Sequence, residues 1–295
     1  MPVIGITLGD AAGIGPEIVA AALRGGKLDP GFDYRVIGAT ANAAPGEPTP
    51  ATARAARMAL EESVRMVRAG EIAAVVTGPV HKARMQAEGF AYPGQTEFFA
   101  ERAGVRDFAM CLTGGALTVA LVTAHIPLRA VAGSLSASEI IRVGKLLAVF
   151  LTVRLGHPPR IAVAGLNPHA GESGALGREE IEIIAPAITL LTNHQPPLTP
   201  STFTGPVSPD TVFHRAVAGE FDGVLCMYHD QGLIPLKLHA FDSGVNVTLG
   251  LPFPRTSPDH GTAFEIAGKN LARPDSMIAA LRLAAELVRG QSAPP

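Results

Sequence analysis

The sequence predicts an α/β protein built on a largely parallel sheet. Short apolar runs of strand length alternate with longer helical stretches along most of the chain. This alternation is typical of strands joined by helical crossovers. Several apolar runs also end directly in polar or glycine-rich segments, and open α/β sheets bind ligands at the carboxyl ends of their strands. At 295 residues the chain has room for one large domain or two lobes.

The first strand is expected at residues 3–8 and leads into a glycine-rich turn over residues 9–15. Pro16 suits the first position of a helix and Glu17 its first turn, so a helix is expected at 18–23. The turn lacks the last glycine of the dinucleotide-binding fingerprint, because Ile18 stands at that position. An anion site at the start of the helix and a tight turn without a ligand therefore both remain open.

The later elements follow from the same alternation of patterns. Strands are expected at residues 34–38, 72–76, 117–123, 160–164 and 223–228. Helices are expected at residues 51–69, 98–103, 138–155, 179–191, 210–217 and 276–289.

Composition excludes several classes of protein. The chain is 47% hydrophobic and 17% charged, with a formal net charge of -2 and no basic run, which argues against a nucleic-acid partner. Residues 108–128 lack a formal charge, but the sequence TGG at 113–115 divides them, so we expect two buried strands rather than a membrane helix. No secretion signal is visible at the start. Cys111 and Cys226 lie in apolar runs, as inert thiols of a cytoplasmic protein would.

Three of the nine histidines share one context. His125, His169 and His229 each follow a predicted buried strand by a few residues. If those strands are parallel, the imidazoles come from one edge of the sheet and could converge. Three neutral imidazoles with an open position suit a divalent cation such as zinc. Because the spacing matches no short zinc motif, a metal site and ordinary histidines of the protein interior both remain open.

Lys237 and Arg255 are cations in largely apolar surroundings. Unpaired cations are seldom buried. We therefore expect them to meet an anion, and a small anionic substrate is the partner that this pattern indicates.

The order of motifs along the chain resembles that of a known family. TLGDAAGIGPEI, TGPVHK, PGQTEFFAERAG, GLNPHAGESGALGREE, SPDTVF, MYHDQGLIPLK and GVNVTLGLPFPRTSPDHGTAFEIAGKN follow one another from end to end. They resemble the 4-hydroxythreonine-4-phosphate dehydrogenase (PdxA) family of the pyridoxal phosphate pathway over nearly the whole chain.

The resemblance implies a two-lobed α/β/α subunit of the isocitrate/isopropylmalate dehydrogenase type, with the active-site cleft between the lobes. Residues 1–105 plus 256–295 would form the first lobe, on the cofactor side. Residues 106–255 would form the second lobe, with the metal, the substrate and the dimer interface. The family also implies a homodimer with a shared active site.

The family's functional residues are carried over by matching motifs. The resemblance implies metal ligands and catalytic residues at His125, His169 and His229, with Lys237 also catalytic. It implies substrate contacts at Gln95, Thr96, Lys237, Asn246 and Arg255, and an acidic residue lent by the partner subunit at Asp210. It implies cofactor contacts at His260, Gly261, Thr262, Gly268 and Asn270.

The implied reaction is the metal- and NAD-dependent oxidation of a secondary alcohol. The metal would be zinc, magnesium or cobalt and the cofactor NAD or NADP. The substrate would be 4-phosphohydroxy-L-threonine or a 4-phosphothreonate or 4-phosphoerythronate, with decarboxylation expected to follow. Gln95 replaces the family's usual histidine, and residues 38–51 form a shorter segment. A cis-dihydrodiol dehydrogenase of the same family, or a non-redox metal-dependent hydrolase or lyase, are the alternatives.

Overall fold

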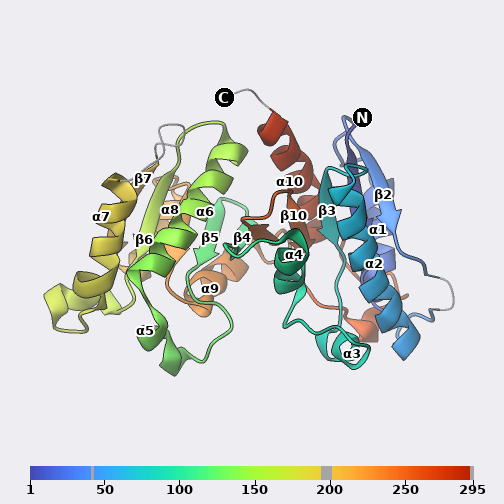
Figure 1. Cartoon of the computed structure of the whole chain (residues 1–295), viewed down its shortest axis with the longest axis horizontal. Helices are drawn as coiled ribbons and strands as arrows, with labels where there is room; N and C mark the ends of the chain where they lie inside the picture. Colours follow the sequence, from blue (N-terminus) through green and yellow to red (C-terminus); the bar gives the residue numbers. More distant parts are fainter. Residues whose placement is uncertain (41–42, 194–200, 293–295) are drawn as a thin grey trace. The chain divides into compact units, whose positions relative to one another are not determined.

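The computed structural model describes residues 1–40, 43–193 and 201–292. The chain divides into two units (Figure 1), the first made of Met1–Arg106 and Asp242–Arg289. The second unit is Asp107–Phe241 with the residues from Gly290 onwards. The second segment of the first unit therefore begins at Asp242, whereas the sequence analysis expected it to begin at residue 256. The earlier start has a simple cause, because residues 245–249 pair with residues 256–258 in one antiparallel ladder.

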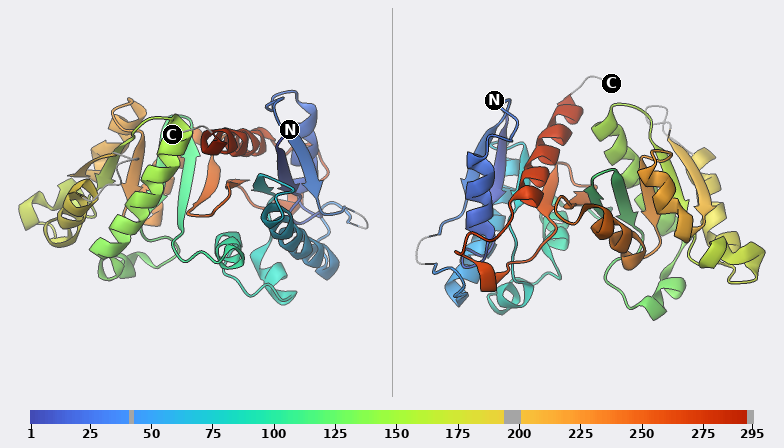
Figure 2. Two further views of the ribbon diagram at one scale, coloured as in Figure 1. Left: turned by 45° about the horizontal axis from the view of Figure 1, so that its top comes forward. Right: turned by 180° about the vertical axis from the view of Figure 1, so that it is seen from behind.

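The first unit holds a five-stranded part of the sheet in the order β2-β1-β3-β10-β9. The pairs β1/β2, β1/β3 and β3/β10 are parallel, whereas β9 and β10 are antiparallel. Helices α2 and α4 cover one face of these strands, and α1 and α10 lie on the other (Figures 1 and 2). The elements are β1 (Val3–Thr7), α1 (Gly15–Arg24), β2 (Asp33–Ile37), α2 (Pro50–Arg68), β3 (Ala74–Thr77), α3 (Lys82–Ala87), α4 (Gln95–Ala103), β9 (Val245–Leu249), β10 (Arg255–Pro258), η4 (Phe264–Ile266) and α10 (Asp275–Ser292).

The second unit holds strands in the order β4-β5-β8-β6-β7, all parallel except the β4/β5 hairpin. Helices α6 and α7 cover one face, and α8 and α9 cover the other (Figure 1). The elements are β4 (Ala109–Gly114), β5 (Leu117–Leu121), η1 (Leu128–Ala130), α5 (Val131–Ser134), α6 (Ala137–Leu155), β6 (Arg160–Ala164), η2 (Pro168–Gly174), η3 (Glu180–Ile184), α7 (Ala185–Asn193), β7 (Thr202–Val207), α8 (Pro209–Val217), β8 (Gly223–Cys226) and α9 (His229–Ala240).

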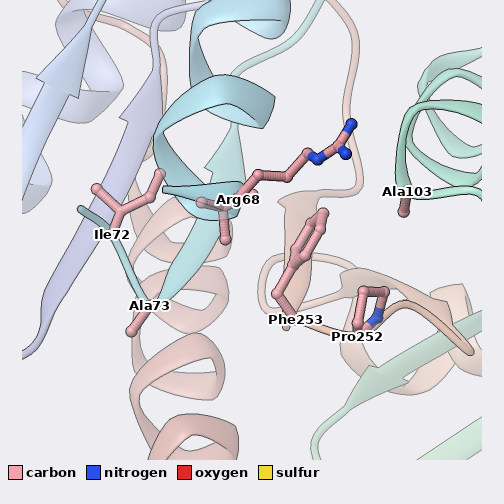
Figure 3. Close-up of a pocket in the computed structure, with 7 residues that line it drawn as sticks. Arg68, Ile72, Ala73, Ala103, Pro252 and Phe253 are labelled. Atoms are coloured by element: carbon pink, nitrogen blue, oxygen red, sulfur yellow. The ribbon is translucent and has the colours of Figure 1, made fainter. Parts of the chain in front are cut away.

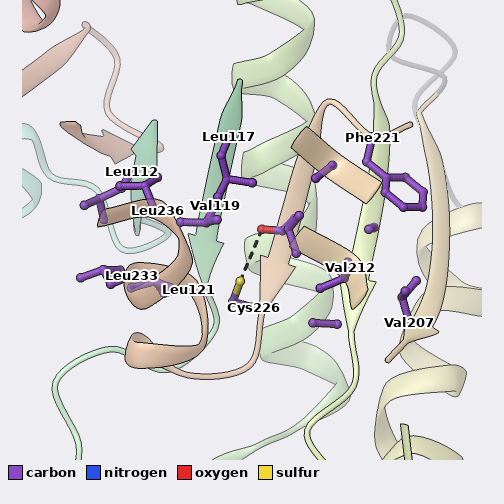
Figure 4. Close-up of a cluster of buried hydrophobic side chains, with 14 residues drawn as sticks. Leu112, Leu117, Val119, Leu121, Val207, Val212, Phe221, Cys226, Leu233 and Leu236 are labelled. Carbon is purple, nitrogen blue, oxygen red and sulfur yellow. Dashed lines mark hydrogen bonds between the residues drawn. The ribbon is translucent and has the colours of Figure 1, made fainter. Parts of the chain in front are cut away.

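Each unit has its own core. In the second unit, strand side chains meet Val212 and Ala216 of α8 and Leu233 and Leu236 of α9 (Figure 4). In the first unit, the core lies between the strands and helices α2 and α4. Burial of these apolar side chains contributes about 25 cal/mol per Å² to the stability of each unit.

The predicted α/β class is confirmed, but the sheet is mixed rather than parallel. Two hairpin pairs, β4/β5 and β9/β10, are antiparallel. No helix was predicted after the strand at 223–228, whereas the structure has helix α9 there, beginning at His229. Gly232 and Pro235 lie inside this helix, and both residues normally oppose helix formation.

Candidate functional site

The three expected metal ligands follow three neighbouring strands of the second unit. His125 follows β5, His169 follows β6 and His229 follows β8, and these strands are adjacent in the order β5-β8-β6. The rings of His125 and His229 lie side by side, with centroids 5.5 Å apart and planes inclined by 44°. The structure therefore brings two of the three imidazoles together directly.

His169 lies in an unusual stretch of backbone. Residues 169–173 all have φ between 44° and 81°, and only Gly171 among them is a glycine. A left-handed conformation costs about 1–2 kcal/mol for each non-glycine residue. Within the turn, the His169 Nδ1 atom and the Glu172 Oε1 atom lie 2.7 Å apart. Strain of this kind persists only where the surroundings hold it, and it concentrates at functional sites.

The chemistry of the histidines fits a divalent metal. His229 resembles His169 in having its Nδ1 atom 2.7 Å from a carboxylate oxygen, here Oδ1 of Asp230. A proton held on Nδ1 leaves the Nε2 lone pair to bind, and a carboxylate behind a ligating imidazole is typical of metal sites. Over the described ranges 1–40, 43–193 and 201–292, no group of three or more His, Cys, Asp or Glu side chains stands close enough together to hold a metal ion. A joint site of all three histidines stays a prediction.

Asp210 and Lys237 belong to the same unit as the histidines. Asp210 is exposed in the first turn of α8 and accepts a 2.5 Å hydrogen bond from the Ser208 hydroxyl. The hydrogen bond from Ser208 is the main reason why the pKa of Asp210 lies below its usual value, with a smaller contribution from the nearby His169 ring. Asp210 is thus near His169 within one chain, although the family resemblance assigns it to the partner's site. Lys237 is half-buried on α9.

Arg255 opens β10 in the first unit and is only 3% exposed. Its Nη2 atom donates to Thr77 Oγ1 at 2.6 Å and to Gln95 Oε1 at 3.0 Å, and its Nη1 atom donates to Thr248 Oγ1 at 3.3 Å. Its guanidinium lies 5.5 Å from the centre of the Phe99 ring.

The partners of Arg255 are neutral. Among the described residues no carboxylate forms an ion pair with it, and its buried Nε atom has no hydrogen-bond partner. Burial lowers the pKa of Arg255 to about 10, with Glu97 opposing the shift. A buried guanidinium that forms no ion pair among the described residues, and that has a donor still unused, has the charge and the hydrogen-bonding capacity that an anion site requires.

Of the expected substrate residues, Gln95 contacts this arginine directly and Thr96 lies beside its partner Thr248. Gln95 is held at both ends of its amide, because its Nε2 atom also donates to Gly78 O at 3.3 Å. Thr96 lies across from Thr248, with 3.5 Å between the two hydroxyl oxygens. Asn246 is on β9, and its buried Oδ1 atom has no partner among the described residues. The sequence missed Thr77 and Thr248; the motif TGPV at the end of β3 was the available signal for Thr77.

The expected cofactor residues follow β10 and pack against the glycine-rich turn. Ile14 N donates to Thr262 O at 2.9 Å, and Gly268 N donates to Glu17 Oε2 at 3.1 Å. A Cβ on Gly13 would stand 2.7 Å from Thr262 O, so this glycine is required by the chain's own packing. Of the other expected contacts, His260 and Gly261 precede Thr262, and Asn270 follows Gly268 with a left-handed φ of 55°.

Two buried carboxylate oxygens in this region fit a dinucleotide. Asp10 Oδ2 and Glu17 Oε1 lack a hydrogen-bond partner among the described residues. A carboxylate oxygen with unused acceptor capacity can accept a hydrogen bond from a hydroxyl group, and an acidic residue accepts a ribose hydroxyl in dinucleotide sites, although there it lies about 20 residues beyond the glycine-rich turn. The residues of this segment therefore fit NAD, although the sequence analysis assigned neither carboxylate to the cofactor.

The first unit also contains a cavity of about 410 Å³, which is separate from the expected site residues (Figure 3). Arg68, Ile72, Ala73, Ala103, Pro252 and Phe253 line it with Val67. Ile72 and Ala73 precede β3, so the cavity is at the amino end of that strand. None of the expected site residues borders it, and ligands of such sheets bind at the opposite, carboxyl ends.

In the parts of the chain that the structure describes, no helix has the length and apolarity needed to cross a membrane.

Comparison with known proteins first gives the class, which is that of α/β dehydrogenases. The solved 4-hydroxythreonine-4-phosphate dehydrogenase of Klebsiella pneumoniae superposes with a TM-score of 0.83 at 36% identity, over 98% of this chain and 100% of that one. A curated protein of the same name from Bradyrhizobium diazoefficiens is 45% identical over 295 residues, 97% of this chain and 84% of the relative. The chain belongs to the PdxA family: the model of pyridoxal phosphate biosynthetic protein PdxA matches residues 21–284.

Two other solved structures mark the breadth of this fold. A terephthalate 1,2-cis-dihydrodiol dehydrogenase from Burkholderia xenovorans is 28% identical with a TM-score of 0.70, over 97% of this chain and 98% of that one. A β-decarboxylating dehydrogenase from Thermococcus kodakarensis is 15% identical with a TM-score of 0.51, over 98% of this chain and 95% of that one, and shows the fold alone. The predicted isocitrate/isopropylmalate dehydrogenase type of fold is confirmed.

Proposed function

We propose that this protein oxidises the secondary hydroxyl of a small phosphorylated hydroxy acid, with 4-phosphohydroxy-L-threonine as its foremost substrate. The observation that carries this proposal is Arg255, a buried cation whose described partners are all neutral. A substrate phosphate would supply the missing charge. The names of the relatives support the particular substrate.

His125, His169 and His229 would hold the divalent metal, which is zinc, magnesium or cobalt, and the segment from His260 to Asn270 would hold NAD or NADP. When bound, the metal lowers the pKa of the substrate hydroxyl and the nicotinamide accepts the hydride. The Nδ1 contacts of His169 and His229 with carboxylates fix which ring nitrogen faces the ligand.

Arg255 would bind the phosphate and so orient the reacting carbon. The unused Nε donor and the guanidinium plane suit a phosphate oxygen pair. Holding the far end of a substrate removes much of its freedom before reaction. Gln95 is held by hydrogen bonds to Arg255 and Gly78, so it orients the arginine. As an amide, its side chain does not gain or lose a proton near neutral pH.

The acidic residues differ in their capacity to accept the hydroxyl proton. The pKa of Asp210 is depressed, first by its bond from Ser208, which makes this carboxylate a weak base. Asp230 is engaged with His229. Loss of carbon dioxide would follow if the product is a β-keto acid, and trapping released carbon dioxide would test that step.

The deciding experiment is a side-by-side dehydrogenase assay. Purified protein with NAD and with zinc, magnesium or cobalt is given 4-phosphohydroxy-L-threonine, 4-phosphoerythronate and a cis-dihydrodiol, and NADH formation is followed by absorbance. We expect turnover of a phosphorylated substrate that a chelator abolishes. Turnover of none of the three, or turnover unaffected by removing metal, would refute the proposal.

Oxidation of a cis-dihydrodiol is the second candidate. A structural relative with that name is 28% identical, and Gln95 departs from the usual family histidine. A dihydrodiol carboxylate could use the same cation. Inorganic phosphate distinguishes the two, because it should compete with a phosphorylated substrate far better than benzoate does, and the reverse holds for a dihydrodiol enzyme.

We also propose a homodimer that shares its active sites. Ile234, Leu238 and Phe241 recur along α9 at three- and four-residue intervals and are exposed, Leu238 to 88%. An exposed apolar helix stripe of this kind supports association with a second copy. Sedimentation of Leu238→Asp should show a monomer, with Leu190→Asp on α7 as the exposed control; an unchanged dimer would place the interface elsewhere.

A cytoplasmic location is proposed from the two reduced, buried thiols.

A further inference from the structure

A chain of buried hydrogen bonds joins the three loops that carry His125, His169 and His229. The first link joins the His125 and His229 loops. Thr123 donates to the carbonyl of Met227 twice, from its hydroxyl at 2.7 Å and from its backbone N–H at 3.2 Å. Thr123 stands two residues before His125, and Met227 stands two residues before His229.

Gln231 supplies the second link, between the His229 and His169 loops. Its side chain lies in the first turn of α9 and is 7% exposed. The Oε1 atom accepts the Met227 N–H at 2.6 Å, and the Nε2 atom donates to Gly165 O at 2.7 Å. One amide thus uses its acceptor on one loop and its donor on the other. Glutamate could not donate, and asparagine is one methylene shorter.

Glu180 anchors the loop that carries His169. It is 3% exposed. Its Oε1 atom accepts the backbone N–H groups of Leu166 and Asn167, each at 2.7 Å, and its Oε2 atom accepts from Asn167 Nδ2 at 3.0 Å. Burial raises the pKa of Glu180, but the hydrogen bonds from Asn167 and Leu166 more than offset it and hold the pKa below its usual value.

The same carboxylate stands close to the left-handed turn. A Cβ on Gly171 would lie 2.7 Å from Glu180 Oε2. Glu180 also opens a single π-helical turn, a feature that recurs at functional sites. The charged carboxylate therefore holds the start of the strained turn in place from below.

We propose that Gln231, acting with Glu180, is the positioning residue that sets the spacing between the three histidine loops. This inference rests on the proposed metal site for its purpose, but the coupling itself belongs to the chain without metal. Each link lies behind the histidines rather than among them, so these residues act through the loops. If the histidines are already held in place before the cation binds, less conformational entropy is lost on binding.

The coupling is tested first on metal-free protein by hydrogen–deuterium exchange with peptide-level mass spectrometry. In Gln231→Leu we expect exchange at least about tenfold faster at Met227 and over residues 166–176, because both loops lose an anchor. In Gln231→Glu the acceptor remains, so Met227 should stay protected while residues 166–176 loosen. Gln86→Leu, which removes an exposed amide on α3, is the matched control and should change neither region. Wild-type exchange over both regions in Gln231→Leu would overturn the proposal.

The purpose of the coupling is tested by calorimetric titration of the same metal-free proteins with Co²⁺. Loss of supporting hydrogen bonds around metal ligands typically weakens binding by about 10–100-fold. We expect that loss in Gln231→Leu and Glu180→Gln at a temperature where both remain folded by circular dichroism. Should Gln231→Leu not fold, the near-isosteric Gln231→Glu carries both measurements.

The outcomes separate this inference from the proposed function. His169→Ala should abolish Co²⁺ binding; if it binds like the wild type, the proposed metal site fails, and the exchange data alone decide whether the loops are coupled. If His169→Ala loses binding while Gln231→Leu keeps wild-type affinity, the metal site stands and the positioning role is refuted.

Discussion

Arg255 is the residue on which the proposed binding of phosphate rests. Its hydrogen-bond partners are all neutral, so removing it should cost the protein its anion rather than its fold. We expect Arg255→Ala to raise KM for the phosphorylated substrate about 100-fold, equivalent to about 2.7 kcal/mol, with a smaller change in kcat. Inorganic phosphate should raise the thermal midpoint of the wild type but not of the variant.

Arg282, an exposed arginine on α10 that donates to Lys27 O, is the control for this prediction. Arg282→Ala should leave KM unchanged. An unchanged KM in Arg255→Ala would mean that the phosphate binds elsewhere.

The depressed pKa of Arg255 predicts a pH dependence. Burial lowers its pKa in the folded protein to about 10, well below that of an unperturbed arginine. The charged form binds phosphate, so affinity should fall as pH rises through about 10. Between the two values the unfolded chain binds the extra proton, so this residue's contribution to stability rises with pH there.

Phosphate titrations by calorimetry between about pH 8 and 11 check the binding part of this prediction. Arg255→Lys, whose pKa when unperturbed is about 10.4 and falls on burial, should lose affinity at a lower pH. An affinity that stays level to pH 11 would show that Arg255 does not hold the anion.

At the scale of the element, α9 carries two faces with opposite roles. Leu236 is fully buried against β5 and β4, whereas Leu238 projects into solvent. Leu236→Ala should cost about 2–5 kcal/mol in the free energy of unfolding, because it leaves a cavity. Leu238→Ala should change the stability of a subunit by less than about 0.5 kcal/mol. Urea unfolding of the two variants checks the contrast; equal losses would contradict the assignment of faces.

Helices and strands with a clear pattern of apolar residues in the sequence were predictable, and elements that depend on tertiary contacts were not. Strand β6 begins and ends where the sequence places it, at Arg160 and Ala164, because an apolar run is bounded there by turns. Helix α9 was missed because Gly232 and Pro235 break its pattern, and packing against the sheet overrides that local preference. The left-handed turn was also invisible, because residues such as Ala170 rarely adopt that conformation.

The same division holds for the site. A histidine a few residues beyond a buried strand was a usable signal, and the structure brings His125 and His229 together. Glu180 and Gln231 gave no such signal, because their roles depend on hydrogen bonds to loops distant in sequence. Local patterns therefore suggested candidate ligand residues, whereas the residues that support their loops were identifiable only in the folded chain.

At the scale of the whole molecule, both cysteines are sealed in the core. Burial raises the pKa of Cys111 to about 12 and raises that of Cys226 further. The reactive thiolate is therefore scarce at neutral pH. We expect no thiol to react with Ellman's reagent in the native protein and two to react in denaturant. Rapid labelling of folded protein would show that the strands open without global unfolding.

The two units differ in how the chain supplies them. The second is nearly all drawn from the continuous stretch Asp107–Phe241, whereas the first needs Asp242–Arg289 to complete its strands. On the ribosome, the nascent second unit can therefore acquire its core before the first unit has its last two strands. Residues 1–106 must wait, partly assembled, for β9 and β10 to emerge, and this interval is when a trigger-factor-like chaperone has most to protect.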